Sequence, residues 1–78
     1  MIKAVLRYTD CLQDGRKVYS VLTNNKIPIV GTKQGWSMYP RITVLLKDYD
    51  QLNNVLYALN HTCTYEVRLI KYHTVKEK

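Results

Sequence analysis

Apolar and polar residues alternate along two early segments of the chain, with the period of two that half-buried β-strands show. Residues 2–9 and residues 16–23 both follow this pattern. Asp14-Gly15 lies between them, and this dipeptide tolerates the positive φ angles that a type I′ hairpin turn requires. The pattern therefore predicts a β-hairpin, with a bulge near residues 10–12 because the faces of the two strands match only moderately.

Residues that break regular structure interrupt the alternation over residues 24–37. These turn-forming residues are Asn24, Asn25, Pro28, Gly31 and Gly35. A short extended piece is predicted at residues 27–30, and its proline limits it to a sheet edge or a bulge. Long irregular stretches in small domains are typical of functional or mobile loops.

A third strand is predicted at residues 38–47, where β-branched and apolar residues return. Both of its faces are apolar around Val44 and Leu45, which is typical of a central strand. Alternation resumes over residues 63–73 and predicts the last strand there.

A helix is predicted between these last two strands. It begins after Asp48, because Asp48 and Gln51 form a capping-box pattern. Apolar residues follow at the spacing of a single helix face: Leu52, Val55, Leu56 and Leu59. Asn60 is predicted to end this helix.

The predicted order of elements is β-β-(β)-β-α-β. We expect a single small basic α+β domain over residues 1–78, built as two layers. One layer is a mostly antiparallel sheet of four to five strands, and the other is one helix on one face of that sheet. The opposite face has no helix to cover it, so we expect it to face solvent or to form an interface.

Composition narrows the class of protein. The chain has 78 residues, of which 46% are hydrophobic, and 12 Lys and Arg against six Asp and Glu give a net charge of +6. It is too short for two ordinary domains and too apolar for a disordered tail. Because no membrane span or signal-peptide pattern is seen, we expect a cytoplasmic protein with no membrane partner. Cys11 and Cys63 are expected to be reduced, with a disulfide and a homodimer as open alternatives.

The positive charge is concentrated in the first half of the chain. Residues 1–41 hold seven basic and two acidic residues, whereas residues 42–78 hold five and four. The residues expected on the uncovered sheet face are Lys3, Arg7, Arg41 and Arg68, with Tyr39 and Tyr72 beside them. Basic side chains interleaved with aromatic rings are typical of surfaces that bind single-stranded nucleic acid. A solvated strand face that carries charge to discourage aggregation is the alternative.

The stretch over residues 24–37 adds further candidates. Trp36 is either a contact residue or a residue that folds back to close the core. The predicted helix carries no Lys or Arg, which argues against reading of a DNA major groove. The full set of candidate partner-binding residues is Lys3, Arg7, Arg16, Lys17, Lys26, Lys33, Trp36, Tyr39, Arg41, Arg68 and Tyr72.

No catalytic constellation is recognisable in the sequence. Its aspartates fall at predicted turn and helix-cap positions, and no activated nucleophile or phosphate-cradling glycine loop is present. His61 and Cys63, with His73 and Cys11 elsewhere, lack the tight ligand pairs of a structural zinc site. We therefore expect a protein that is not an enzyme and that has no metal or cofactor.

Three functions fit these observations. The first is a non-enzymatic module that binds RNA or single-stranded DNA through the basic sheet face and the 24–37 loop. In size, basicity and lack of a catalytic motif the chain is similar to small phage and mobile-element proteins, a likeness of overall style that assigns no residue. The second hypothesis is an anti-defence, anti-CRISPR-like inhibitor that binds an acidic surface of a nucleic-acid-processing protein, because the same basic face would be attracted to any anionic target. The third is a dimeric structural accessory protein.

Overall fold

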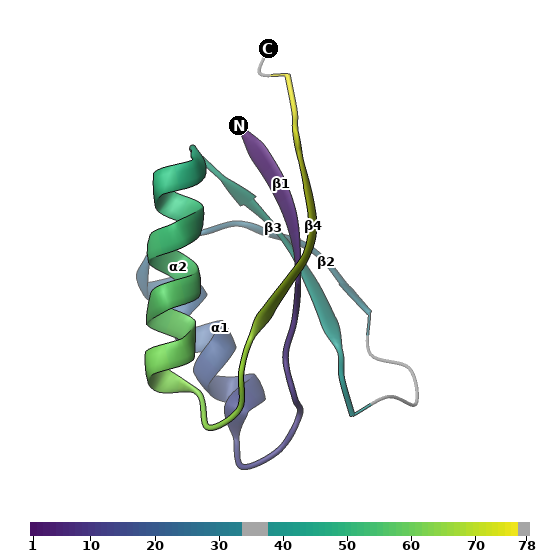
Figure 1. Cartoon of the computed structure of the whole chain (residues 1–78), viewed down its shortest axis with the longest axis vertical. Coiled ribbons are helices and arrows are strands. Elements are labelled where there is room, and N and C mark those ends of the chain that lie inside the picture. The colour runs from purple at the N-terminus through teal and green to yellow at the C-terminus, as the bar shows by residue number, and fades with distance from the viewer. Residues whose placement is uncertain (34–37, 77–78) are drawn as a thin grey trace.

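A computed structural model describes residues 1–33 and 38–76. Its elements, in chain order, are β1 (Ile2–Arg7), α1 (Asp14–Asn24), β2 (Ile29–Lys33), β3 (Arg41–Leu46), α2 (Tyr49–Thr62) and β4 (Arg68–Thr74). In this part of the chain, four strands form one sheet in the order β2-β3-β1-β4, and all neighbouring strands are antiparallel. Both helices lie on the same side of the sheet (Figure 1).

The chain consists of two strand-helix-strand units, β1-α1-β2 and β3-α2-β4. β1 and β2 flank β3, and β3 and β4 flank β1, so each unit leaves a gap that a strand of the other unit fills. This arrangement is the split β-α-β, or ferredoxin-like, topology. The predicted α+β class, with an antiparallel sheet and one uncovered face, is confirmed, although the order of elements and the number of helices differ from the prediction.

The predicted hairpin is wrong, because residues 14–24 form the helix α1 and not a strand. Val18 and Leu22 are four residues apart, a spacing that places two residues on one face in a strand and in a helix alike. Ser20 distinguishes the two, since a strand would bury it with its neighbours and a helix exposes it. Val18 and Leu22 are fully buried and Ser20 is exposed, as the helix requires. Asp14 is the first residue of α1, so it does not form a hairpin turn.

The other predicted elements are largely confirmed. The extended piece predicted at residues 27–30 overlaps β2 at residues 29 and 30, and β2 continues to Lys33. This strand lies at the sheet edge, as its proline predicted, and has a register shift between Ile29 and Gly31. The third strand is β3, which is central as expected. The last strand is shorter than predicted, because residues 63–65 form a bend and residues 66–67 have no regular secondary structure before β4.

The predicted start of α2 is confirmed in its side-chain contacts. Asp48 is the N-cap, and its Oδ1 accepts a hydrogen bond from the backbone N–H of Gln51 at 2.9 Å. Asn60 does not end the helix, which continues to Thr62. Its side chain instead accepts from the backbone N–H of Val67 at 2.8 Å and donates to the Val67 carbonyl at 3.1 Å, and so ties α2 to the segment before β4.

The hydrophobic core lies between the sheet and the two helices. Alternate residues of β1 and β3 enter it from the sheet: Ile2, Ala4, Leu6, Ile42, Val44 and Leu46. The helices contribute Val18, Leu22, Leu52, Val55 and Leu59. Because the strands alternate, the residues between these core positions point to the opposite side of the sheet, which we call the open face.

Candidate nucleic-acid interface

The open face carries a line of positive charge at one end of the sheet. Residues that are directly opposite in antiparallel strands share a face, so the strand register places their side chains next to one another. Four basic residues, one from each strand, are opposite one another in turn. This set, which we call the cation row, is Lys33, Arg41, Arg7 and Arg68. Since neighbouring strands are about 4.8 Å apart, the row crosses roughly 15 Å of the sheet.

Like charges that are directly opposite in a sheet destabilise it, and the cation row contains three such pairs. Arg68 has one acidic neighbour, since its Nε lies 3.3 Å from Oε1 of Glu66 in an exposed ion pair. Such a pair contributes at most about 1 kcal/mol. The Arg7 guanidinium lies over the ring of Tyr39, 5.5 Å from its centroid, in a cation–π contact. Within residues 1–33 and 38–76, Arg7, Lys33 and Arg41 make no ion pair with an acid.

Several of the residues predicted to bind a partner are therefore brought together. Lys3, Arg7, Arg41 and Arg68 share the open face as the sequence alternation predicted, and Lys33 joins them from β2. Lys3 lies away from the row, opposite Leu45 and His73. Tyr39 lies beside the row through its contact with Arg7.

The remaining predicted residues do not join this surface. Arg16 and Lys17 lie on α1 and Lys26 follows that helix, so they belong to the helical layer, because the segment predicted as a strand is a helix. Tyr72 is opposite Ala4, a core position, and its ring makes an edge-to-face contact with Tyr49 at a centroid distance of 5.5 Å. The prediction that Tyr72 lies beside the basic face is therefore wrong. Trp36 lies outside the described residues.

A β-bulge in β4 explains why Tyr72 lies on the core side of the sheet. It also explains why Lys71 and His73, which were not predicted from the sequence, lie on the open face. The register between β1 and β4 shifts by one residue, which leaves Ile70 as the extra residue. Beyond the bulge, Lys71 and His73 lie on the open face, opposite Val5 and Lys3. Strict alternation from Arg68 would place both on the other face, so the sequence held no signal for them.

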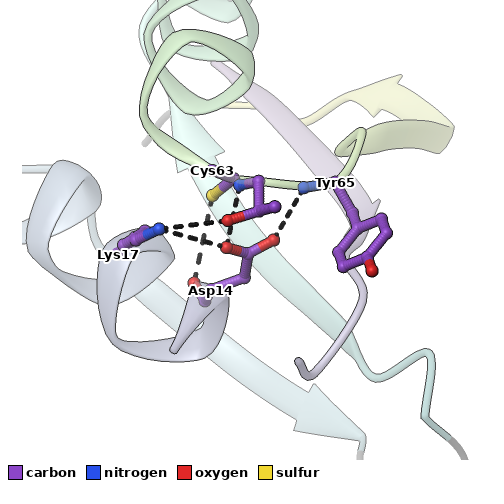
Figure 2. Close-up of polar contacts among 5 residues, drawn as sticks. Asp14, Lys17, Cys63 and Tyr65 are labelled. Carbon is purple, nitrogen blue, oxygen red and sulfur yellow. Dashed lines mark hydrogen bonds and ion pairs between the residues drawn. The ribbon is translucent and has the colours of Figure 1, made fainter. Parts of the chain in front are cut away.

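The buried carboxylate of Asp14 connects the start of α1 to the segment before β4 and is not part of the open face. Its Oδ1 and Oδ2 accept hydrogen bonds from the backbone N–H groups of Thr64 and Tyr65, both at 2.9 Å (Figure 2). Lys17 Nζ lies 3.5 Å from Oδ1 and donates to the Thr64 hydroxyl at 3.2 Å. Burial alone would raise the pKa of Asp14, but these hydrogen bonds and the Lys17 charge outweigh it and hold the pKa below its ordinary value.

The thiol of Cys63 lies in the same cluster, 3.9 Å from the carbonyl oxygen of Asp14. Burial, together with the nearby Asp14 charge, raises the pKa of this thiol, while Lys17 opposes the shift. A raised pKa favours the protonated thiol over the reactive thiolate. Cys11 and Cys63 are both free in the structure.

Neither a metal centre nor a membrane span is found in the described part of the chain. No three His, Cys, Asp or Glu side chains there gather closely enough to hold an ion. No helix there is long and apolar enough to cross a bilayer. Comparison of the chain with protein-family models and with curated proteins found no match in either case.

Proposed function

We propose that this chain is a non-enzymatic module that binds single-stranded nucleic acid, RNA or DNA, by its phosphate backbone across the open face. The cation row is the observation that carries this proposal. Four basic side chains, each opposite the next on four strands, form a strip without acids inside it. A bound polyanion would relieve the repulsion within the row, and the release of its counterions would drive binding.

The surroundings of the row favour a particular mode of binding. The well-known sheet-based RNA modules place aromatic residues on the two central strands, where bases stack. Here the open face of β1 and β3 carries Val5, Thr43 and Leu45 between the basic residues, and Tyr39 lies at one end of the sheet. Contacts to phosphates therefore dominate this mode, and little preference among sequences is expected.

The low positive charge of the two helices favours single-stranded over double-stranded nucleic acid as the ligand. α2 carries no Lys or Arg, and α1 carries only Arg16 and Lys17, of which Lys17 is engaged with the buried Asp14. Neither helix therefore presents the basic surface of a helix that enters the major groove. Two free cysteines fit the reducing cytoplasm, the setting that the proposal assumes.

The proposal is tested by fluorescence anisotropy with a labelled oligonucleotide of about 15 nucleotides, near the upper end of site sizes for single-strand binding domains. For four phosphate contacts, the slope of log K against log salt is about −2.8, so affinity falls roughly 50-fold between about 50 and 200 mM salt. In the Arg7→Gln/Arg41→Gln variant two contacts are lost, and the slope falls to about −1.4.

A matched control separates local contacts from net charge. The Arg16→Gln/Lys26→Gln variant also removes two positive charges, but from exposed positions in the helical layer. It should keep the wild-type slope. Absence of binding at low salt, or an equal loss in both double variants, would contradict the proposal. Capture of an acidic protein partner with no oligonucleotide binding would instead support the inhibitor hypothesis.

A further inference from the structure

A hollow of about 260 Å³ lies on the open face beside the cation row. Residues from all four strands line it, among them Val5, Gly31, Lys33, Arg41, Thr43 and Lys71. By register, Gly31, Thr43, Val5 and Lys71 form the row next to the cation row. The first three have short side chains or none, whereas long basic side chains surround them, and this difference in length creates the hollow.

Gly31 contributes to this open space because it has no side chain, and the hollow leaves room for one there. A Cβ atom added at Gly31 would meet Thr43 first, at 3.7 Å from its Cβ and 3.8 Å from its Oγ1, which is ordinary van der Waals contact. The backbone at this position is not in the left-handed region that favours glycine. Glycine inside a strand weakens the strand and often marks either a bulge, such as the register shift between Ile29 and Gly31, or a place where a ligand approaches closely.

The chemistry around the hollow suits a phosphate group. Lys33, Arg41 and Lys71 supply positive charge from three different strands, and the planar guanidinium of Arg41 can donate two parallel hydrogen bonds to phosphate oxygens. The Thr43 hydroxyl offers a further donor, and no Asp or Glu among the described residues lines the hollow. Val5 adds an apolar surface of the kind that a sugar ring can cover.

We propose that this hollow is a subsite for one backbone phosphodiester of the bound strand, with the adjoining sugar lying over Gly31. The inference rests on the proposed function and deepens it, because it fixes one position of the strand relative to the cation row. Lys71, which the β4 bulge brings to this face, then acts as a fifth phosphate contact.

The test measures binding of an oligothymidylate of about 15 nucleotides without a terminal phosphate, at about 50 mM salt, so that only backbone phosphates are available. Gly31→Val fills the hollow without a change of charge and should weaken binding about tenfold or more, as expected for a lost phosphate contact together with a displaced sugar. Gly31→Ala should have a smaller effect in the same direction. Thermal unfolding should show an unchanged or higher Tm for Gly31→Val, because valine favours strands.

A pair of lysine variants supplies the matched control. Lys71→Gln and Lys3→Gln each remove one exposed lysine from the open face, but only Lys71 lines the hollow. Lys71→Gln should lose about eightfold in affinity, the salt-dependent part of one phosphate contact at this salt concentration, and Lys3→Gln distinctly less. If the wild type binds while both glycine variants bind equally well and the lysine variants do not differ, the subsite is wrong and the proposed function stands. If the folded wild type binds no oligonucleotide, both are wrong.

Discussion

Neutralising the carboxylate of Asp14 should lower the free energy of unfolding more than neutralising any other acid in residues 1–33 and 38–76. Asp14→Asn keeps the size of the side chain but replaces one acceptor oxygen with an NH₂ group. That group faces the backbone N–H of Thr64 or Tyr65, both of which bond to the carboxylate at 2.9 Å. The ion pair with Lys17 is lost as well. The variant therefore leaves a buried donor without a partner in the turn before β4.

The size of this effect follows from the contacts. Hydrogen bonds to a charged group contribute about 1.5–3 kcal/mol each, and the asparagine keeps one neutral bond of about 1 kcal/mol. The expected loss in the free energy of unfolding is therefore about 2–5 kcal/mol. For a domain of 78 residues, this corresponds to a fall in Tm of roughly 10–30 °C. The assay is thermal and urea unfolding followed by circular dichroism.

The pH dependence of the same variant provides a second readout. The pKa of Asp14 is lower in the folded protein than its ordinary value of 3.8, so the carboxylate stabilises the fold above that pH. This contribution is lost as the pH falls through the lowered folded-state pKa. The stability difference between wild type and Asp14→Asn should therefore be constant from neutral pH to about 5 and should shrink toward acid pH.

The control is Asp10→Asn, which neutralises an exposed acid near the same helix and should change stability by no more than about 0.5 kcal/mol. A Tm of Asp14→Asn equal to that of the wild type would refute the reasoning. A stability difference that stays constant down to about pH 2 would refute it too, because the charge would then contribute nothing.

Three further predictions concern other parts of the chain. Asn60→Ala should destabilise the fold by about 1–3 kcal/mol in urea unfolding, since it removes the bonds between α2 and the segment before β4; an unchanged midpoint would contradict this. Tyr39→Ala should weaken oligonucleotide binding about two- to fivefold through its contact with Arg7, whereas Tyr72→Ala should not, because Tyr72 faces the helical side. An equal loss in both variants would place the ligand elsewhere. Iodoacetamide should label Cys11 before Cys63, as followed by mass spectrometry, because Cys63 is buried and its pKa is raised. The reverse order would show that the segment over residues 63–65, which is bonded to Asp14, opens readily.

The sequence predicted those parts of the fold whose signals are local. The alternation in residues 2–9 and 38–47 predicted the two central strands β1 and β3, and the cap at Asp48 predicted the start of α2. The alternation also predicted that Arg7 and Arg41 share an uncovered face, because an unbroken strand alternates strictly. Each of these signals depends on residues within one element, so no knowledge of the tertiary contacts was needed.

The tertiary structure decided what local patterns left ambiguous. Val18 and Leu22 fit a strand and a helix equally well, and only packing against α2 and the sheet determines that the segment is helical. The extra residue Ile70 is set by how β4 pairs with β1, and it moves Lys71 to the open face and Tyr72 away from it.

The sequence by itself thus determined an antiparallel α+β domain with a basic, uncovered sheet face, because periodicity and capping act over a few residues. The tertiary structure decided which strands are neighbours and in what register. Those two facts turn scattered basic residues into the cation row and place the Gly31 hollow beside it. Register is a long-range property, since it depends on hydrogen bonds between residues that are far apart in the chain, and a shift of one residue reverses the face of every side chain that follows.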